Sequence, residues 1–313
     1  MRARQHLVRW LALALLAWAI DATAAEAPRC PPTVTATATD ATAPARDRGL
    51  LWRITRDGRA SYLFGTLHVG KPGWRRFGPQ VSAALRAVDV LALEIDPGDP
   101  DLLKAMAELR PPQDLPPALQ QRLARAFERA CVAADSMATL HPVLQATSLT
   151  VLEARWFSLD PNFALEQALA AQARTLGRRV VSLETAAQQT QALVPDDEAE
   201  AQALLDQSLQ QLEDGSARRV LQRLSAAWER GDLATLEDYE KWCECIASEA
   251  EREFLRQLND ERNPGLAAGI EAQHKLGRRV FAAVGALHFT GPQALQTLLA
   301  RRGFRVERIV FAH

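Results

Sequence analysis

A tetrapeptide pattern, Gly-x-Leu-His, occurs twice in this 313-residue chain, ending at His68 and at His288, and it strongly constrains the fold. An apolar run precedes each copy: Tyr62-Leu63-Phe64 before the first and residues 280–284 before the second. Such runs are typical of buried strands, and a glycine at a strand end allows the chain to turn sharply. Each histidine is therefore expected at the mouth of a sheet, and the matching settings predict one shared site.

The remaining pattern predicts an α/β core interrupted by helices. Residues 51–54 and 60–64 are expected to form a hairpin around Asp57-Gly58. Asn263-Pro264-Gly265 is expected to interrupt the chain before a short helix that ends at Gly277. The other expected elements are a helix over 77–87, strands over 88–95 and 179–183, a last strand–helix–strand unit over 280–284, 293–301 and 306–311, and large helical insertions over about 101–176 and 196–261.

The first residues have the pattern of a secretory signal peptide over 1–24. Three arginines precede an apolar stretch, and the small residues Ala22-Thr23-Ala24 favour cleavage after Ala24. A retained membrane anchor is the alternative, although the apolar stretch is short for a span. Residues 25–48, rich in Ala, Thr and Pro, are expected to be a flexible leader, and 49–313 the folded domain. We therefore expect a periplasmic or secreted protein without a stable membrane span after cleavage.

Composition limits the partners that we expect. With 37 basic and 38 acidic residues the formal net charge is −1, and no long basic stripe occurs, so no nucleic-acid partner is expected. A peptide or a small molecule is the expected partner. Export would allow disulfides among Cys30, Cys131, Cys243 and Cys245, with the connectivity open. A zinc cluster of these cysteines is disfavoured because Cys-x-Cys lacks a second closely spaced pair.

Polar residues follow four of the expected strands: His68, Glu94, Glu184 and His288. In open α/β sheets, sites form outside the carboxyl ends of the strands. Imidazole nitrogens and carboxylate oxygens are a common ligand set for a divalent metal that activates water. Each residue also has a structural interpretation: a hydrogen-bonded turn for either histidine, an ion pair with an arginine for Glu94, and a helix cap for Glu184.

Several motifs together resemble the TraB/GumN family, which includes the Tiki metalloproteases. They occur in order from about residue 50 to the C-terminus: Phe64-Gly-Thr-Leu-His68, residues 88–96 ending in Leu-Glu-Ile-Asp, Leu183-Glu184-Thr185 with Gln188, Trp228 to Leu233, Glu261-Arg262-Asn263, residues 284–292, and 302–306. Two departures, Leu159-Asp160 in place of Gly-Val-Asp and Phe-Thr-Gly after His288, touch no proposed ligand.

The resemblance implies a central mixed sheet flanked by helices, similar to the erythromycin-esterase and ChaN-like proteins. It also implies a metal-dependent hydrolytic centre, with His68, Glu94 and His288 as metal ligands. Glu184 would be a general base, and Arg262 would stabilise an oxyanion, unless Arg262 forms an ordinary buried ion pair with Glu94 or Glu184. Zinc, manganese and cobalt all suit such ligands.

Two functions of different classes follow. The first is an exported metallohydrolase that cleaves peptide or other amide or ester bonds. The second is a non-catalytic periplasmic protein that binds or sequesters a peptide or small ligand, in keeping with the pheromone-shutdown role associated with TraB-type relatives. The sequence favours the hydrolase, because a binding pocket alone does not require two histidines and two carboxylates at one place.

Overall fold

The computed structural model describes residues 30–109, 115–246 and 248–312, and the expected signal peptide lies outside them. The description below concerns the compact unit that begins at Pro31. Its centre is a six-stranded mixed sheet with the strand order β4-β3-β5-β2-β1-β6. The strands are β1 (Leu50–Arg56), β2 (Arg59–Thr66), β3 (Val90–Leu93), β4 (Arg179–Ser182), β5 (Val280–Gly285) and β6 (Arg305–Ile309).

The strand directions confirm the predicted α/β architecture. Strands β4, β3, β5 and β2 are mutually parallel, whereas β1 pairs antiparallel with both β2 and β6. The predicted β1–β2 hairpin turns at Asp57 and Gly58, which both have positive φ, of 52° and 72°. An Asp-Gly pair suits that turn because aspartate tolerates, and glycine prefers, this conformation.

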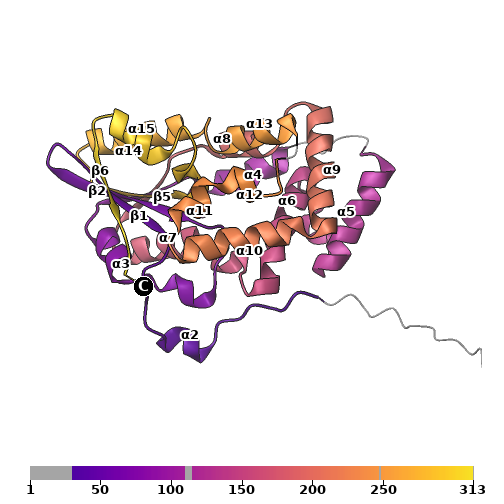
Figure 1. The fold of residues 1–313 in the computed structure, drawn as a ribbon, viewed down its shortest axis with the longest axis horizontal. Helices are drawn as coiled ribbons and strands as arrows, with labels where there is room; N and C mark the ends of the chain where they lie inside the picture. Colours follow the sequence, from indigo (N-terminus) through magenta and orange to yellow (C-terminus); the bar gives the residue numbers. More distant parts are fainter. Residues whose placement is uncertain (1–29, 110–114, 247, 313) are drawn as a thin grey trace, which may run out of the picture. The chain divides into compact units, whose positions relative to one another are not determined.

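Helices cover the sheet and extend beyond one side of it (Figure 1). Their bounds are α2 (Ala38–Thr42), α3 (Pro79–Arg86), α4 (Pro100–Glu108), α5 (Pro117–Ala130), α6 (Pro142–Leu152), α7 (Leu165–Thr175), α8 (Ala186–Leu193), α9 (Glu198–Asp214), α10 (Ser216–Glu229), α11 (Leu233–Glu237), α12 (Tyr239–Trp242), α13 (Glu249–Leu258), α14 (Asn263–Lys275) and α15 (Leu295–Arg301). Helix α14 contacts β5 and helix α15 contacts β6, whereas α7 contacts both β3 and β4.

Two separate groups of buried apolar side chains stabilise the fold. The larger one surrounds the sheet and contains fully buried residues such as Leu91, Phe281 and Leu266. The smaller one lies among α5, α6 and α9, with Leu123 and Leu209 as examples. Because α5 and α6 lie in the first expected insertion and α9 in the second, the two insertions pack on one another. This helical part lies at the right of Figure 1.

Helix α14 begins earlier than the sequence pattern suggested. Asn263-Pro264-Gly265 was expected to interrupt the chain, but these residues form the first turn of α14. Proline is tolerated there because its missing N–H would have no partner within the helix, and its φ already suits a helix. The proline therefore marks the start of a helix.

Part of the expected leader has defined contacts. Residues 38–42 form α2, and Arg46 forms an isolated parallel β-bridge with Phe77. The Asp47 carboxylate accepts hydrogen bonds from the backbone N–H groups of Gln80 and Val81, at 3.0 and 2.9 Å, in the first turn of α3. Acceptors are favoured at this position because the first N–H groups of a helix have no partner within it.

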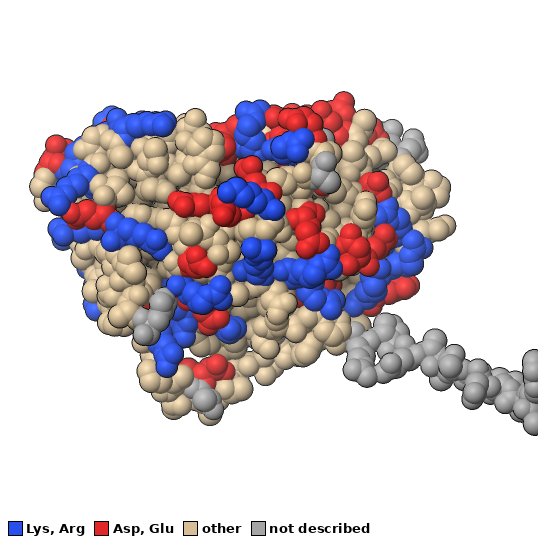
Figure 2. All heavy atoms as spheres, viewed as in Figure 1, with Lys and Arg blue, Asp and Glu red and all other residues tan. Residues whose placement is uncertain are grey.

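The described residues contain no helix long and apolar enough to cross a membrane. On the face shown in Figure 2, acidic and basic side chains are intermixed rather than gathered into one large patch of either sign. All four cysteines are disulfide-bonded, and one of the bonds joins Cys243 to Cys245. Disulfides fit an extracytoplasmic location.

Matched leucine substitutions on α14 test its packing on the sheet. Leu266 is fully buried, whereas Leu276, at the end of the helix, is 64% exposed. We expect Leu266→Ala to lower the free energy of unfolding by about 2–5 kcal/mol, because it removes buried contacts and leaves a cavity. Leu276→Ala should change it by less than about 0.5 kcal/mol. Urea denaturation followed by circular dichroism measures both, and equal effects would contradict the placement of α14.

Candidate functional site

The four polar residues predicted at strand ends lie along one edge of the sheet. Because β4, β3, β5 and β2 are parallel neighbours in that order, their carboxyl ends meet at the same edge. Glu184 follows β4 by two residues, Glu94 directly follows β3, His68 follows β2 by two residues, and His288 lies in the short 3-10 helix Ala286–Phe289 after β5. The sheet thus brings together residues that are up to 220 positions apart in the sequence.

Glu94 is the central acceptor of this edge. Its side chain is 8% exposed, and Oε1 accepts a 2.6 Å hydrogen bond from the backbone N–H of Gly285. Its Oε2 accepts from Arg262 Nη2 at 2.5 Å. Burial alone would raise the pKa of this carboxyl, but His288, Arg262 and His68 together hold the pKa well below its usual range. Glu94 is therefore a charged group that depends on nearby positive charge.

Arg262 joins the two glutamates. Its Nε and Nη2 donate to the two carboxylate oxygens of Glu184 at 2.9 and 2.5 Å, a paired geometry that suits a planar guanidinium. Its Nη1 donates to the carbonyl oxygen of Leu258 at 3.0 Å. Burial would lower the pKa of Arg262, but the two carboxylates raise it above its ordinary value. The structure therefore has the buried ion pair that the sequence allowed for Arg262, formed with both glutamates at once.

His288 is oriented by Asn263, a residue that the sequence analysis did not select. The Asn263 Nδ2 group donates to the carbonyl oxygens of His288 and Gln293, at 3.1 and 2.9 Å. Two carbonyl partners fix which end of the amide is nitrogen, so Asn263 Oδ1 must be the atom 2.7 Å from His288 Nδ1. An oxygen there accepts, so Nδ1 carries a proton. Nε2 is then directed toward Glu94, with 3.6 Å between Nε2 and Glu94 Oε1.

His68 has a similar arrangement with Glu166 of α7, which the sequence analysis also did not select. The distance between His68 Nδ1 and Glu166 Oε1 is 3.1 Å. Both carboxylate oxygens of Glu166 are buried, and their charge raises the pKa of His68 to about 9. His68 itself has a side chain that is 64% exposed. It is therefore the member of the site most accessible to an incoming ligand.

Hydrogen bonds fix the chain both before and after His68, at Gly65 and at Gly70. Gly65 accepts a 2.7 Å hydrogen bond from the indole Nε1 of Trp228. Gly70 exchanges two backbone hydrogen bonds with Asp160, at 3.1 and 2.9 Å. Any side chain at Gly70 would collide with the carbonyl oxygen of Phe163, because a Cβ would lie 2.1 Å from it. Asp160, the partner of Gly70, belongs to the Leu159-Asp160 segment that departs from the family motif, and its sequence did not indicate this contact.

Gly285 leaves open the space between the candidate ligands. A Cβ at Gly285 would lie 3.3 Å from Glu94 Oε1 and 4.0 Å from His68 Nε2. When the His288 ring is neutral, its Nε2 and Glu94 Oε1 are facing acceptors, which repel one another unless positive charge neutralises them. A proton or a divalent cation can supply that charge. The donor types therefore fit a cation.

The present arrangement is not a ready chelate. Over the described residues, no three His, Cys, Asp or Glu side chains are grouped so that they could hold an ion together. Glu94 is already engaged by Gly285 and Arg262. Binding of an ion would therefore require adjustment, and the exposed His68 is the side chain with most freedom to make it.

The polar edge of the sheet lies within a region that matches a known protein family. The model of the TraB/PrgY/gumN family matches residues 50–308, which include all six strands up to Arg308 and every residue of the site described above. The chain belongs to the TraB/PrgY/gumN family. This confirms the family resemblance stated from the sequence. No curated protein and no solved structure matches, so the likeness of this family member to the ChaN-like fold stays a prediction.

The role of Asn263 can be tested on the tautomer of His288. Wild-type protein should show His288 protonated at Nδ1 and unprotonated at Nε2 when the ring is neutral, because Asn263 Oδ1 accepts from Nδ1. Asn263→Ala should remove this preference, whereas Asn259→Ala, four residues earlier in the chain, should retain it. Ring-nitrogen chemical shifts in ¹⁵N-labelled histidine measure the tautomer. A wild-type ring protonated at Nε2 would contradict the assignment.

Proposed function

We propose that this protein is an exported metal-dependent hydrolase of peptide or other amide or ester bonds. The observation that supports it best is a pair of imidazole rings beside one buried carboxylate: His288 Nδ1 is hydrogen-bonded to Asn263 Oδ1, and His68 Nδ1 lies 3.1 Å from Glu166 Oε1 in an ion pair. In metal sites the second nitrogen of a ligating histidine commonly bonds to such an oxygen, which fixes the direction of Nε2. Asn263 and Glu166 are suitably placed for that role.

In this proposal His68, Glu94 and His288 hold the cation. A divalent ion such as zinc, manganese or cobalt would polarise a substrate carbonyl and lower the pKa of a water molecule. Glu184 would accept a proton, as its place beside the ligands at the sheet edge suggests. Arg262 donates to both glutamates and to a backbone carbonyl, so we assign it a positioning role in place of direct contact with an oxyanion.

A cleft next to Glu184 offers space for a substrate. It has a volume of ≈ 610 Å³ and lies between α4 and α8 at the end of β4, with Lys104, Ser182 and Glu184 among its lining residues. Clefts of this size accommodate small molecules or short peptide segments. Both charged and apolar groups line it, which suits a peptide better than a purely apolar ligand.

Metal titration is the first test. Purified protein should bind one divalent ion per chain, and His68→Ala or His288→Ala should each weaken binding by at least about 100-fold, because each removes a ligand. His141→Asn is the matched control: it changes a histidine outside the site and retains a side-chain acceptor at the start of α6. Isothermal titration calorimetry measures the affinities. No binding by the wild type would rule out the metallohydrolase and favour the non-catalytic sequestering function.

Measurements of kcat and of metal affinity together show whether Glu184 acts as a general base or as a metal ligand. On a panel of chromogenic peptide and ester substrates, Glu184→Gln should lower kcat by about 10²–10⁴-fold, because an amide cannot accept the proton. Its metal affinity should remain that of the wild type. Glu213→Gln, on α9 and ion-paired with Arg122 away from the site, should leave kcat unchanged. A Glu184→Gln variant with full activity would remove Glu184 from the mechanism.

A further inference from the structure

A disulfide lies outside the set of polar residues described at the sheet edge. Cys243 and Cys245 form a disulfide in the connection between α12 and α13. The bond closes a loop of only three residues. The chain entropy that a disulfide removes from the unfolded state increases with loop length, so this bond contributes little to stability by that route. Stabilisation of the fold is therefore a weak explanation for it.

The two cysteine residues differ in exposure. Cys243 is fully buried, whereas Cys245 is partly exposed. A thiolate approaching from solvent would therefore meet Cys245 Sγ first. Attack at one sulfur of a disulfide expels the other, so Cys243 would be the leaving group.

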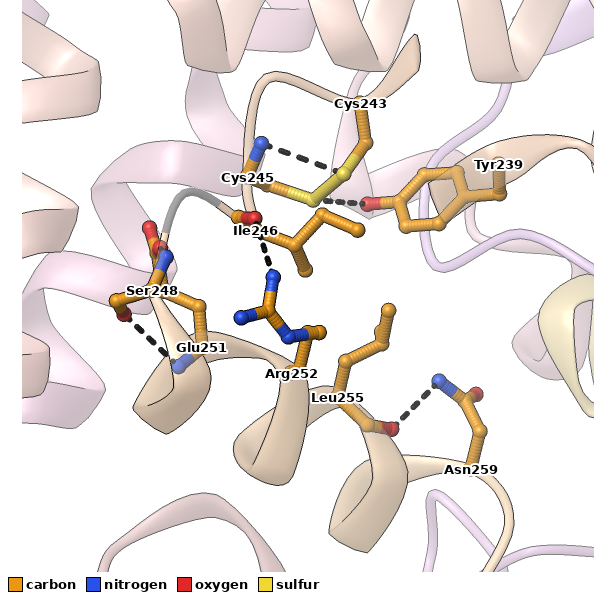
Figure 3. Close-up of a disulfide and its surroundings, with 9 residues drawn as sticks. All are labelled: Tyr239, Cys243, Cys245, Ile246, Ser248, Glu251, Arg252, Leu255 and Asn259. Carbon is orange, nitrogen blue, oxygen red and sulfur yellow. Dashed lines mark hydrogen bonds between the residues drawn. A yellow bond between two sulfur atoms is a disulfide. The ribbon is translucent and has the colours of Figure 1, made fainter. Parts of the chain in front are cut away.

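Each sulfur also lies beside a hydrogen-bond donor. The backbone N–H of Cys245 lies 3.3 Å from Cys243 Sγ and donates to it. Tyr239 Oη lies 3.5 Å from Cys245 Sγ, and Figure 3 shows the hydroxyl directed at the disulfide. An oxidised sulfur carries no hydrogen, so the Tyr239 hydroxyl is the donor. Donors at these positions stabilise a thiolate on either sulfur once the bond is broken.

The residue between the cysteines favours opening of the loop. Glu244 has a positive φ of 52°, a left-handed conformation that is unfavourable for a residue with a side chain. Arg219 of α10 forms a 2.5 Å ion pair with the Glu244 carboxylate. Reduction would release the constraint on Glu244, while the ion pair would keep the loop near its present place. Labile disulfides are the ones used in exchange reactions.

We propose that Cys243–Cys245 is a thiol–disulfide exchange site that oxidises thiols. A thiolate attacks Cys245 Sγ and forms a mixed disulfide, and the electron pair of the broken bond leaves with Cys243 as a thiolate. A second thiolate attacks the partner sulfur of the mixed disulfide and expels Cys245. The two partner thiols end joined by a disulfide, and their two protons end on Cys243 and Cys245. The chemistry requires only a thiol, either a small one or a cysteine of another protein.

Matched single variants test which sulfur reacts. Cys243→Ser leaves the accessible thiol, and Cys245→Ser leaves the buried one. With oxidised glutathione, Cys243→Ser should form the mixed disulfide at least about tenfold faster than Cys245→Ser, measured by mass spectrometry after acid quenching. Equal rates, a reversed order or no reaction of either variant would overturn the proposal.

The wild-type protein tests lability and the thiol source. Reduced glutathione should open Cys243–Cys245 at least about tenfold faster than it reduces Cys30 and Cys131 in the same molecule, with the circular dichroism of the folded chain retained. In a second arm, reduced, unfolded ribonuclease A should gain disulfides with the wild type and not with Cys243→Ser/Cys245→Ser. Faster opening by glutathione supports exchange with small thiols, and disulfides gained by ribonuclease A would show that protein thiols react as well. Reduction no faster than at Cys30 and Cys131, or unfolding upon reduction, would show a structural bond and overturn it.

Discussion

The charge of Glu94, buried at the carboxyl end of β3, is the constraint on which the geometry of the sheet edge depends. An unpaired carboxylate at this place would be very costly, because burial removes its hydration. Arg262 forms ion pairs with both Glu94 and Glu184, and so holds the ends of β3 and β4 to the start of α14. The next residue, Asn263, bonds the His288 side chain and the backbone after β5. Two consecutive residues of one helix turn thus connect three strand ends.

This arrangement also fixes the charge and the orientation of the polar groups at the edge. His288, Arg262 and His68 together keep Glu94 charged, because they hold its pKa well below the usual range against the effect of burial. Arg262 occupies Oε2 of Glu94, and Oε1, which accepts from the backbone N–H of Gly285, also faces His288 Nε2. A buried network of this kind orients the Glu94, Glu184 and Arg262 side chains more than it stabilises the fold, because the cost of desolvation opposes the Coulomb attraction.

The sequence predicted those elements that a short run of consecutive residues is enough to identify. Apolar runs followed by Gly, Glu or His located the strands and their polar ends, and parallel pairing then brought His68, Glu94, Glu184 and His288 to one edge. It did not reveal Glu166 or Asn263. Glu166 lies in the first turn of α7, where a glutamate is common on any helix. Asn263 precedes a proline and a glycine, which is also the pattern of a turn. Only the tertiary contacts with His68 and His288 distinguish them.

The second helical insertion contains the disulfide and also contacts the site at the sheet edge. Helix α13 follows the Cys243–Cys245 loop and ends at Leu258, whose carbonyl oxygen accepts from Arg262. The start of α13 is fixed by its own capping box, in which Ser248 and Glu251 each satisfy the other's backbone N–H. Because that cap involves neither cysteine, the disulfide can open without removing what begins the helix. The start of α13 therefore does not depend on the disulfide.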